Sequence, residues 1–479
     1  MKIPLRLVSF FTSSLILMLL VCGCVAAPDK NGGDENLSEE EETFVPAPDE
    51  ELDPEIQAEY DKYKENAGLA FGTYSPANAS DFEYGGEDGN ITILKYKGSE
   101  RVVVIPEEID GKTVTRIEEE AFSDSTVRAV YVPDSVVFIG RGAFENCDSL
   151  TTLRLPIMGD GAENTNCGYI FGALTSDSNT VAVPASLEMI IFGENVTEVE
   201  DNAMSGFKSL KAVVFTDKLV KIGQFSFYEN EELLYVDLGS SVNEVGEYAF
   251  ADCGSVVRIE LSESCEKIGL GAFLNCESLK YLTLPFVGGS NNENTFFGYI
   301  FGAENYEWND NFVPGSLSDL TLLDTCTEIS DMAFADCTGL VKVTLPENLT
   351  EIGIRAFYNC YSIRGINIPD SVEKIGNDAF FQCRTLESVE FGEGSVLSGI
   401  GKQAFYGCES LKSIVLPDGV TVINASSFFG CKSLESVGFS NVQSIGEDAF
   451  GGCVSLKEAE AIDEEKIEEG NYYYTSVMK

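Results

Sequence analysis

One phrase of apolar and polar positions recurs along the chain from about residue 112. Clean copies are SLKSIVLPDGVTVINASSFFGC, which starts at Ser410, and SIRGINIPDSVEKIGNDAFFQC, which starts at Ser362. The shared pattern is S-L-x-x-V-x-L-P-x-x-V-x-x-I-G-x-x-A-F-x-x-C, and most copies begin 23 residues after the previous one. A period of this length indicates a repeat protein. Its first apolar position is occupied by Val127, Leu150, Leu187, Leu210, Leu233, Val256, Leu279, Leu317, Leu340, Ile363, Leu386, Leu411, Leu434 and Leu456.

Each copy of the phrase predicts one strand and one return segment. The V-x-L residues are two apart, which places both side chains on one face of a strand. The proline ends the strand, because it cannot donate a further ladder hydrogen bond. The glycine of V-x-x-I-G is expected to supply a backbone bend that few other residues tolerate. The A-F pair then fills the interior of the coil with one large ring.

A single coil of this kind cannot fold alone, because the side chains it buries do not offset the entropy of ordering its backbone. Stacking on neighbouring coils must supply the difference. We therefore predict a β-rich, curved solenoid of about 14 coils over residues 80–457, with first turns at about 80–112. Residues 458–479 are expected to form a C-terminal tail.

Two coils, at about 150–187 and 279–317, are longer than the others. Each carries the hexamer GYIFGA, at 168–173 and 298–303, in the place of I-G-x-x-A-F. Phe171 and Phe301 then stand where the repeat phenylalanine belongs. We interpret the hexamer as the closure of an enlarged coil and expect the loops around it to protrude. One of these loops holds Trp308, the only tryptophan of the chain.

The repeat resembles the leucine-rich repeat, and within it the BspA-like repeats of bacterial surface proteins. The resemblance rests on the S-L-x-x-V-x-L-P, I-G-x-x-A-F and N-C elements, and on the stretch 91–122, which is similar to that family's usual first turns. It covers about residues 80–460. The resemblance implies a leucine-rich-repeat solenoid that serves in adhesion or binding at the cell surface.

The N-terminus has the pattern of an export signal, with Lys2 and Arg6 at the start of a short apolar run. The run ends in LLVCGC, which resembles the lipobox of bacterial lipoproteins. Cys24 fits the lipidated position because the small Gly23 precedes it, whereas Cys22 follows a bulky valine. We predict a signal peptide at 1–23, lipidation at Cys24 and a location on the outer face of the bacterial cell membrane. An uncleaved anchor or an ordinary cleaved signal is the alternative.

Residues 24–79 are acidic and poor in apolar side chains, as in DKNGGDENLSEEEETFVPAPDEELDPE at 29–55. Such a segment cannot bury enough apolar surface to fold, and its like charges extend it. We predict a disordered tether that holds the solenoid off the membrane. An acidic binding tail is the alternative.

Composition and charge exclude several classes of function. The 479 residues include 79 acidic and 31 basic side chains, for a net charge of −48. An acidic chain repels nucleic acid and anionic lipid headgroups, so we expect no nucleic-acid partner and membrane contact through the lipid anchor only. The sequence contains no histidine, which excludes Ser-His-Asp and Cys-His catalysis and histidine metal ligands. Carboxylate-only chemistry, as in glycosidases, remains possible.

Most cysteines occupy one slot, three residues after the repeat phenylalanine. Others replace apolar residues, as Cys265 takes the place of Val372. We therefore expect free, buried thiols that act as small hydrophobic side chains, although an exported protein could form disulfides. No C-x-x-C pair occurs, and we expect neither a metal nor a cofactor. The slot holds Cys147, Cys253, Cys276, Cys337, Cys360, Cys383, Cys408, Cys431 and Cys453.

The outward positions of the strands are mostly Thr, Ser, Lys or Glu. Tyr235, Arg258 and Tyr281 differ, because they hold the same slot in consecutive coils. Tyrosine and arginine are common anchors of interfaces. We predict a ligand-binding surface at these three residues, with Trp308 on a neighbouring lip and no catalytic residue. A chance run of solvated side chains is the alternative.

The leading hypothesis is a lipid-anchored surface protein that presents its strand face to a host or neighbouring-cell protein or glycan. A passive structural surface protein without a single ligand is the first alternative. The second is a carboxylate-dependent glycosidase, which would need two acids about 5–10 Å apart in a cleft. The acids of this chain are scattered over exposed slots instead.

Overall fold

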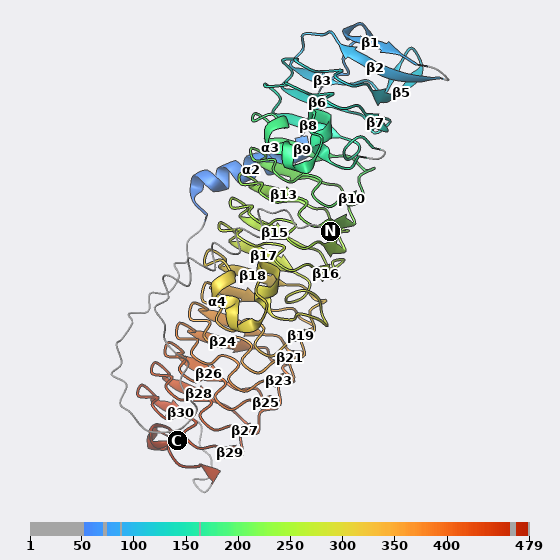
Figure 1. Cartoon of the computed structure of the whole chain (residues 1–479). Helices are drawn as coiled ribbons and strands as arrows, with labels where there is room; N and C mark the ends of the chain where they lie inside the picture. Colours follow the sequence, from blue (N-terminus) through green and yellow to red (C-terminus); the bar gives the residue numbers. More distant parts are fainter. Residues whose placement is uncertain (1–51, 70–73, 87–88, 162–163, 460–465, 478–479) are drawn as a thin grey trace, which may run out of the picture. The chain divides into compact units, whose positions relative to one another are not determined.

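The V-x-L strands stack coil upon coil in two parallel sheets (Figure 1). The computed structural model describes residues 52–69, 74–86, 89–161, 164–459 and 466–477. The register joins equivalent slots, such as Ala212 with Tyr235 and Arg258 with Tyr281. Each of the fourteen expected strand starts opens a strand, and β3 of the first turns adds another, so the predicted solenoid is confirmed. The first sheet contains β3 (Val102–Val104), β6 (Ala129–Tyr131), β8 (Thr152–Leu155), β9 (Met189–Phe192), β11 (Ala212–Val214) and β13 (Tyr235–Asp237). The second contains β15 (Arg258–Glu260), β17 (Tyr281–Leu284), β18 (Asp319–Leu322), β20 (Lys342–Thr344), β22 (Gly365–Ile368), β24 (Ser388–Phe391), β26 (Ser413–Val415), β28 (Ser436–Gly438) and β30 (Glu458–Ala459).

The return segments form further parallel ladders of two-residue strands. One consists of β10 (Glu198–Val199), β12 (Lys221–Ile222), β14 (Glu244–Val245) and β16 (Lys267–Ile268). The other consists of β19 (Glu328–Ile329), β21 (Glu351–Ile352), β23 (Lys374–Ile375), β25 (Gly399–Ile400), β27 (Val422–Ile423) and β29 (Ser444–Ile445). The second enlarged coil separates the two ladders.

The N-terminal end of the stack is a mixed sheet. Antiparallel pairs β1–β2 and β4–β5 close it, and β5 continues in parallel to β7 and so to the regular coils. Its strands are β1 (Phe82–Gly85), β2 (Asn90–Tyr96), β4 (Glu108–Ile109), β5 (Lys112–Ile117) and β7 (Phe138–Ile139).

Helical segments are short apart from α2 (Pro54–Leu69). None of the helices among the described residues is both long and apolar enough to cross a membrane. The remaining helical segments are η1 (Ala79–Asp81), η2 (Cys167–Phe171), η3 (Ser176–Ser178), α3 (Asn179–Ala182), η4 (Phe297–Phe301), η5 (Tyr306–Trp308), α4 (Asn309–Phe312) and α5 (Tyr472–Val477).

Stacked phenylalanine rings fill the core. Phe357 and Phe380, for example, lie with ring centroids 5.2 Å apart and planes at 4°. The stack ends on Tyr474 of α5, which is fully buried, 5.0 Å from Phe450. The expected C-terminal tail therefore begins as strand β30 and its residues 466–477 cap the solenoid.

The repeat glycine has a different role from the one expected. Gly223 and Gly353 do not have positive φ angles, so they supply no left-handed bend. A Cβ on either would instead lie 2.6 Å from a backbone nitrogen of the preceding coil, that of Asp201 or Asp331. Glycine is needed because adjacent coils approach closely. The left-handed positions are other residues of the phrase, such as Asn359 with φ 59°.

The cysteine prediction is confirmed: all twelve thiols among the described residues are free and buried. Most of those in the repeat slot donate to a backbone carbonyl near the repeat phenylalanine of the preceding coil. Cys360 Sγ, for example, lies 3.1 Å from the carbonyl oxygen of Phe334. The thiol thus combines a small apolar volume with a weak hydrogen-bond donor.

A candidate binding surface on the strand face

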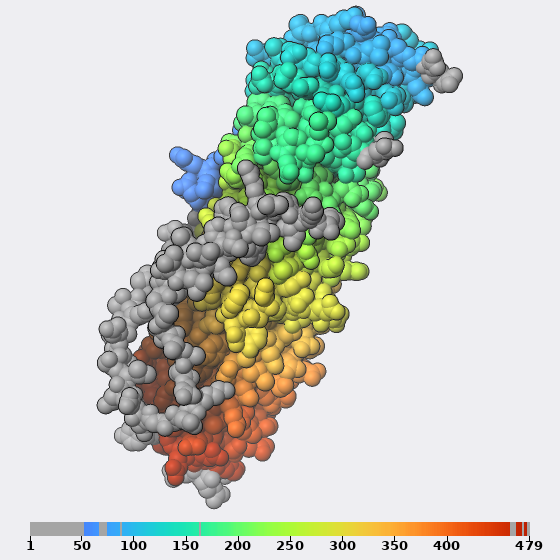
Figure 2. Space-filling model, in the orientation of Figure 1, coloured from blue at the N-terminus to red at the C-terminus, as the bar shows by residue number. Residues whose placement is uncertain are grey.

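Helix α2 lies against the strand face of the solenoid beside β13 (Figure 1). Figure 2 shows the blue atoms of α2 at the surface, next to the green coils. The expected disordered tether over 24–79 is therefore wrong for residues 54–69 and for residues 77–79, which join the first turns, whereas residues 24–51 and 70–73 lie outside the described part. The reason is tertiary. Tyr60 and Tyr63 are only 8% and 2% exposed, because the stacked coils offer an apolar surface that the isolated segment lacks.

Apolar side chains on the outer side of neighbouring strands form the surface under α2. Alternation along a strand puts them outside, since Ile190 and Val213 between them belong to the solenoid core. These outer side chains and the two tyrosines make a cluster separate from that core. We call the outer side chains the strand-face patch: Met189, Ile191, Ala212, Val214, Leu234, Tyr235 and Val257.

Tyr60 is the central contact of the helix. Its ring meets the ring of Tyr235 edge-on, with centroids 5.1 Å apart. The guanidinium of Arg258 lies 5.9 Å from the centroid of the Tyr60 ring and 4.3 Å from that of Tyr281. Arg258 therefore bridges the helix and the next coil by cation–π contacts. Burial raises the pKa of Tyr60 to about 12, so its phenol stays neutral at physiological pH.

Two polar contacts orient the helix. The hydroxyl of Tyr63 donates to Glu188 Oε2 at 3.1 Å, and Lys211 Nζ donates to Glu59 Oε1 at 2.9 Å. Burial and the neighbouring Glu188 carboxylate raise the pKa of Tyr63, and the hydrogen bond to Glu59 raises that of Lys211. Because the Lys211–Glu59 pair is partly exposed, it adds direction more than stability.

The structure brings three of the four predicted site residues together. Tyr235 is 5% exposed under Tyr60, and Arg258 stacks on Tyr281 while also pairing with Glu260 at 3.3 Å. Trp308 lies instead in the loop of the second enlarged coil, where it is 43% exposed and stacks on Phe312 at 6.2 Å. The predicted lipidation site, Cys24, lies outside the described residues.

The largest part of the surface was missed by sequence reasoning. Met189 and Ile191 occupy the two outward slots of β9, and Ala212 and Val214 occupy those of β11. The sequence did contain a signal for this surface. The outward strand slots hold polar side chains in most coils, but in these two consecutive coils they hold apolar ones. The docking of α2 had no comparable signal, since its segment is acidic and mostly polar.

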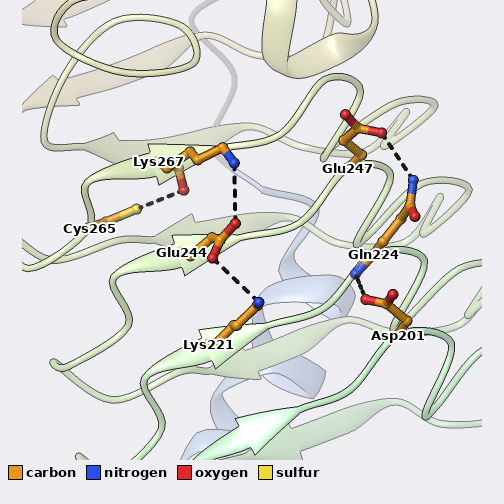
Figure 3. A network of polar contacts seen from close by, with 7 residues as sticks. All are labelled: Asp201, Lys221, Gln224, Glu244, Glu247, Cys265 and Lys267. Carbon is orange, nitrogen blue, oxygen red and sulfur yellow. Dashed lines mark hydrogen bonds and ion pairs between the residues drawn. The ribbon is translucent and has the colours of Figure 1, made fainter.

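The return side of the same coils has the opposite character (Figure 3). Glu244 lies between Lys221 at 3.5 Å and Lys267 at 3.3 Å, in a ladder of alternating charge across β12, β14 and β16. Gln224 Nε2 donates to Glu247 at 3.0 Å beside it. Both lysines and Glu247 are exposed and Glu244 and Gln224 are half-buried, so these contacts contribute little stability. The return side of these coils therefore presents charged side chains where the strand face presents apolar ones.

The hexamer GYIFGA has the structural role that was expected. Phe301 joins the phenylalanine stack 6.3 Å from Phe273. Asn309, fully buried in α4, accepts from the backbone N–H of Gly298 at 2.9 Å and donates to the carbonyl of Ala335 at 2.8 Å. A Cβ at Gly298 would lie 2.5 Å from the Asn309 Oδ1, so glycine is required there.

The arrangement on the strand face is suited to binding. It combines a broad apolar surface with a guanidinium, an ammonium and a carboxylate at its borders. Within the described ranges, no three or more Cys, Asp or Glu side chains are grouped so that they could hold a metal ion.

The repeats match a known family. The family model described as "BspA type Leucine rich repeat region (6 copies)" matches this chain at residues 104–163, 179–299, 309–398 and 398–479. A search of curated proteins gave no match.

Solved structures of similar proteins include other leucine-rich repeat proteins from bacteria. One from Bacteroides ovatus is 22% identical and covers 83% of this chain and 100% of its own, with a TM-score of 0.33. A leucine rich cell surface protein from Faecalibacterium prausnitzii is 21% identical and covers 85% of this chain and 99% of its own, with a TM-score of 0.32.

Proposed function

This chain belongs to the BspA-type leucine-rich repeat family, and we propose that it is an exported surface protein that binds another protein through its strand face. The observation that carries the proposal is the strand-face patch. The outward slots of a solvated strand face usually hold polar side chains. A contiguous apolar surface in these slots marks an interaction site, and α2 covers that surface in this structure. The patch already holds one helical segment, α2, which supports its capacity to bind protein.

The Arg258–Tyr281 pair extends this surface beyond the helix. Both side chains are only partly buried, and the guanidinium lies on the tyrosine ring at 4.3 Å. Arginine and tyrosine anchor many protein interfaces because each combines a large apolar body with a polar end. We place the partner over the strand-face patch and this pair, with the exposed ring of Trp308 as a neighbouring contact.

The surface location forms the second part of the proposal. It rests on the charged and apolar start of the chain and on Cys24 after Gly23. A diacylglycerol and an amide-linked acyl chain on Cys24 would anchor the protein stably, since each buried CH2 contributes about 0.8 kcal/mol. The acidic residues between Cys24 and α2 would then separate the solenoid from the membrane.

A binding screen of the lipid-free protein, residues 25–479, tests the proposal. The probes are host matrix proteins, neighbouring-cell surface proteins and a glycan array. Saturable binding of a protein that is weakened by Tyr281→Ala supports it. Binding only to glycans, hydrolysis of a polysaccharide, or no binding to any probe contradicts it, the last in favour of a passive surface protein.

A further inference from the structure

Few side chains hold α2 on the solenoid. Only Tyr60 and Tyr63 of its described side chains are buried, and its most apolar other residue, Ile56, is 39% exposed. A helix of 16 residues has marginal stability by itself in water. Among the described side chains, its attachment therefore depends on two rings with the Arg258 contact, one ion pair, one hydrogen bond and the partly buried Leu52 just before the helix.

Removal of α2 would leave the solenoid core intact. The cluster around Tyr60 and Tyr63 shares no buried member with the core cluster. Met189, Ala212 and Tyr235 are outer neighbours of core residues, and the hydrogen bonds between their strands do not involve α2. Undocking would expose the strand-face patch without disturbing the stack.

Polar side chains at the borders of the strand-face patch determine which chemical groups a docked helix must carry. Lys211 donates to a carboxylate, as it does to that of Glu59. Arg258 offers its guanidinium to an aromatic ring, as it does to Tyr60. Glu188 accepts a hydrogen bond from a second, deeper ring, as it does from Tyr63.

We propose that α2 is a displaceable resident of the strand-face patch, and that the protein partner presents a helix of the same chemistry in its place. That helix carries two aromatic side chains three residues apart, the second with a hydroxyl, and a carboxylate directly before the first. The inference rests on the proposed function and names the partner's contact. In the resting protein, α2 covers the apolar surface of the patch. When the partner binds, its helix replaces α2 there.

Competition by α2 sets the expected size of the effect. A segment tethered to the same chain acts at an effective concentration of the order of mM. Only the small fraction of molecules in which α2 has left the patch can bind the partner. The apparent affinity of the resting protein is lower than that of the open state by this fraction. Vacating the patch should tighten binding by about tenfold or more.

A peptide of residues 52–69, labelled with fluorescein, is the first probe. Three forms of residues 25–479 are compared. The first has the natural sequence, and the second carries Tyr60→Ala and Tyr63→Ala, which should release α2. The third carries Lys64→Ala, a matched control on the exposed side of α2. Fluorescence anisotropy measures binding of the peptide. Hydrogen exchange of residues 54–69 measures release of the helix, and thermal unfolding checks that the solenoid remains intact.

The released variant should bind the peptide saturably and at least about tenfold more tightly than the natural sequence or Lys64→Ala. A peptide carrying alanine at both tyrosines should not bind, and adding Val214→Glu to the released variant should abolish binding. Two results overturn the proposal. One is unchanged protection of residues 54–69 in the double variant; the other is fast exchange there without peptide binding.

A protein found in the binding screen provides the second probe. It should bind the released variant more tightly than the natural sequence, and it should increase hydrogen exchange of residues 54–69 when it binds the natural sequence. Equal affinity for both proteins, with α2 still protected, would place the partner elsewhere and overturn this inference, while binding itself would leave the proposed function standing.

Discussion

The ring of Tyr60 packs edge-on against the ring of Tyr235, with centroids 5.1 Å apart and planes at 71°, although the two residues lie far apart in the chain. One belongs to an acidic segment before the solenoid and the other to its strand face. This contact joins the two parts of the molecule that most concern its function. It also determines how substitutions on the strand face should behave.

Tyr281→Ala should weaken binding of a protein partner by about 2 kcal/mol, because it removes a partly exposed ring and the support of Arg258. Tyr235→Ala should cost less, since the same change also loosens the competing helix α2. Trp308→Ala reports on the neighbouring lip and should again cost about 2 kcal/mol if that loop touches the partner. Calorimetric titration measures all three.

Lys412→Ala on a distant coil is the control for this series and should change the binding free energy by less than about 0.5 kcal/mol. Equal affinities for all four variants, with the fold intact, would place the site elsewhere.

Cys24→Ser should abolish incorporation of a fatty-acid analogue, because the lipid is expected on that sulfur. Cys22→Ser should leave labelling unchanged. Metabolic labelling followed by membrane fractionation measures both, and the serine variant at position 24 should also remain uncleaved or be released from the cell. Full labelling of Cys24→Ser would refute the lipoprotein assignment.

The twelve thiols of the described residues should all titrate as free under denaturing conditions and react slowly in the native protein. Burial raises the pKa of most of these thiols, that of Cys167 to about 12 and that of Cys265 likewise, so the reactive thiolate is scarce and shielded. Titration with a thiol reagent in the presence and absence of denaturant measures this. Fewer than about half free under denaturing conditions would mean that disulfides help to hold the coils together.

The solenoid should lose stability as the pH rises above about 9. A buried thiol such as Cys265, whose folded pKa of about 12 exceeds its ordinary value of 9.0, binds its proton more tightly in the folded state. Its contribution is therefore fully present below pH 9 and is lost progressively between pH 9 and 12. Thermal unfolding at a series of pH values measures the loss.

Cys265→Val is the matched control for the pH series, because Val372 fills the same slot in another coil. Above pH 9, the melting temperature of this variant should fall less steeply with pH than that of the natural sequence. At pH 7 the two melting temperatures should be nearly equal. An unaltered slope would show that other groups, such as the buried tyrosines, cause the alkaline loss.

The sequence by itself determined the solenoid, because each coil repeats the same local instructions. Leu210 and Leu233 mark strands one period apart, Phe357 and Phe380 stack because they hold one slot, and Cys360 is buried because its slot faces inward. Such features depend on period and on nearest neighbours, and both can be read from one repeat.

The tertiary structure alone decided what covers the strand face. Tyr60 lies in an acidic segment with no marked apolar periodicity, so nothing local predicts a helix that docks. Met189, Ala212 and Tyr235 become one surface only when three coils stack at successive levels. The docking of α2 is a long-range contact whose stability comes from that assembled surface, and this is why the segment was expected to be disordered and the largest part of the site was missed.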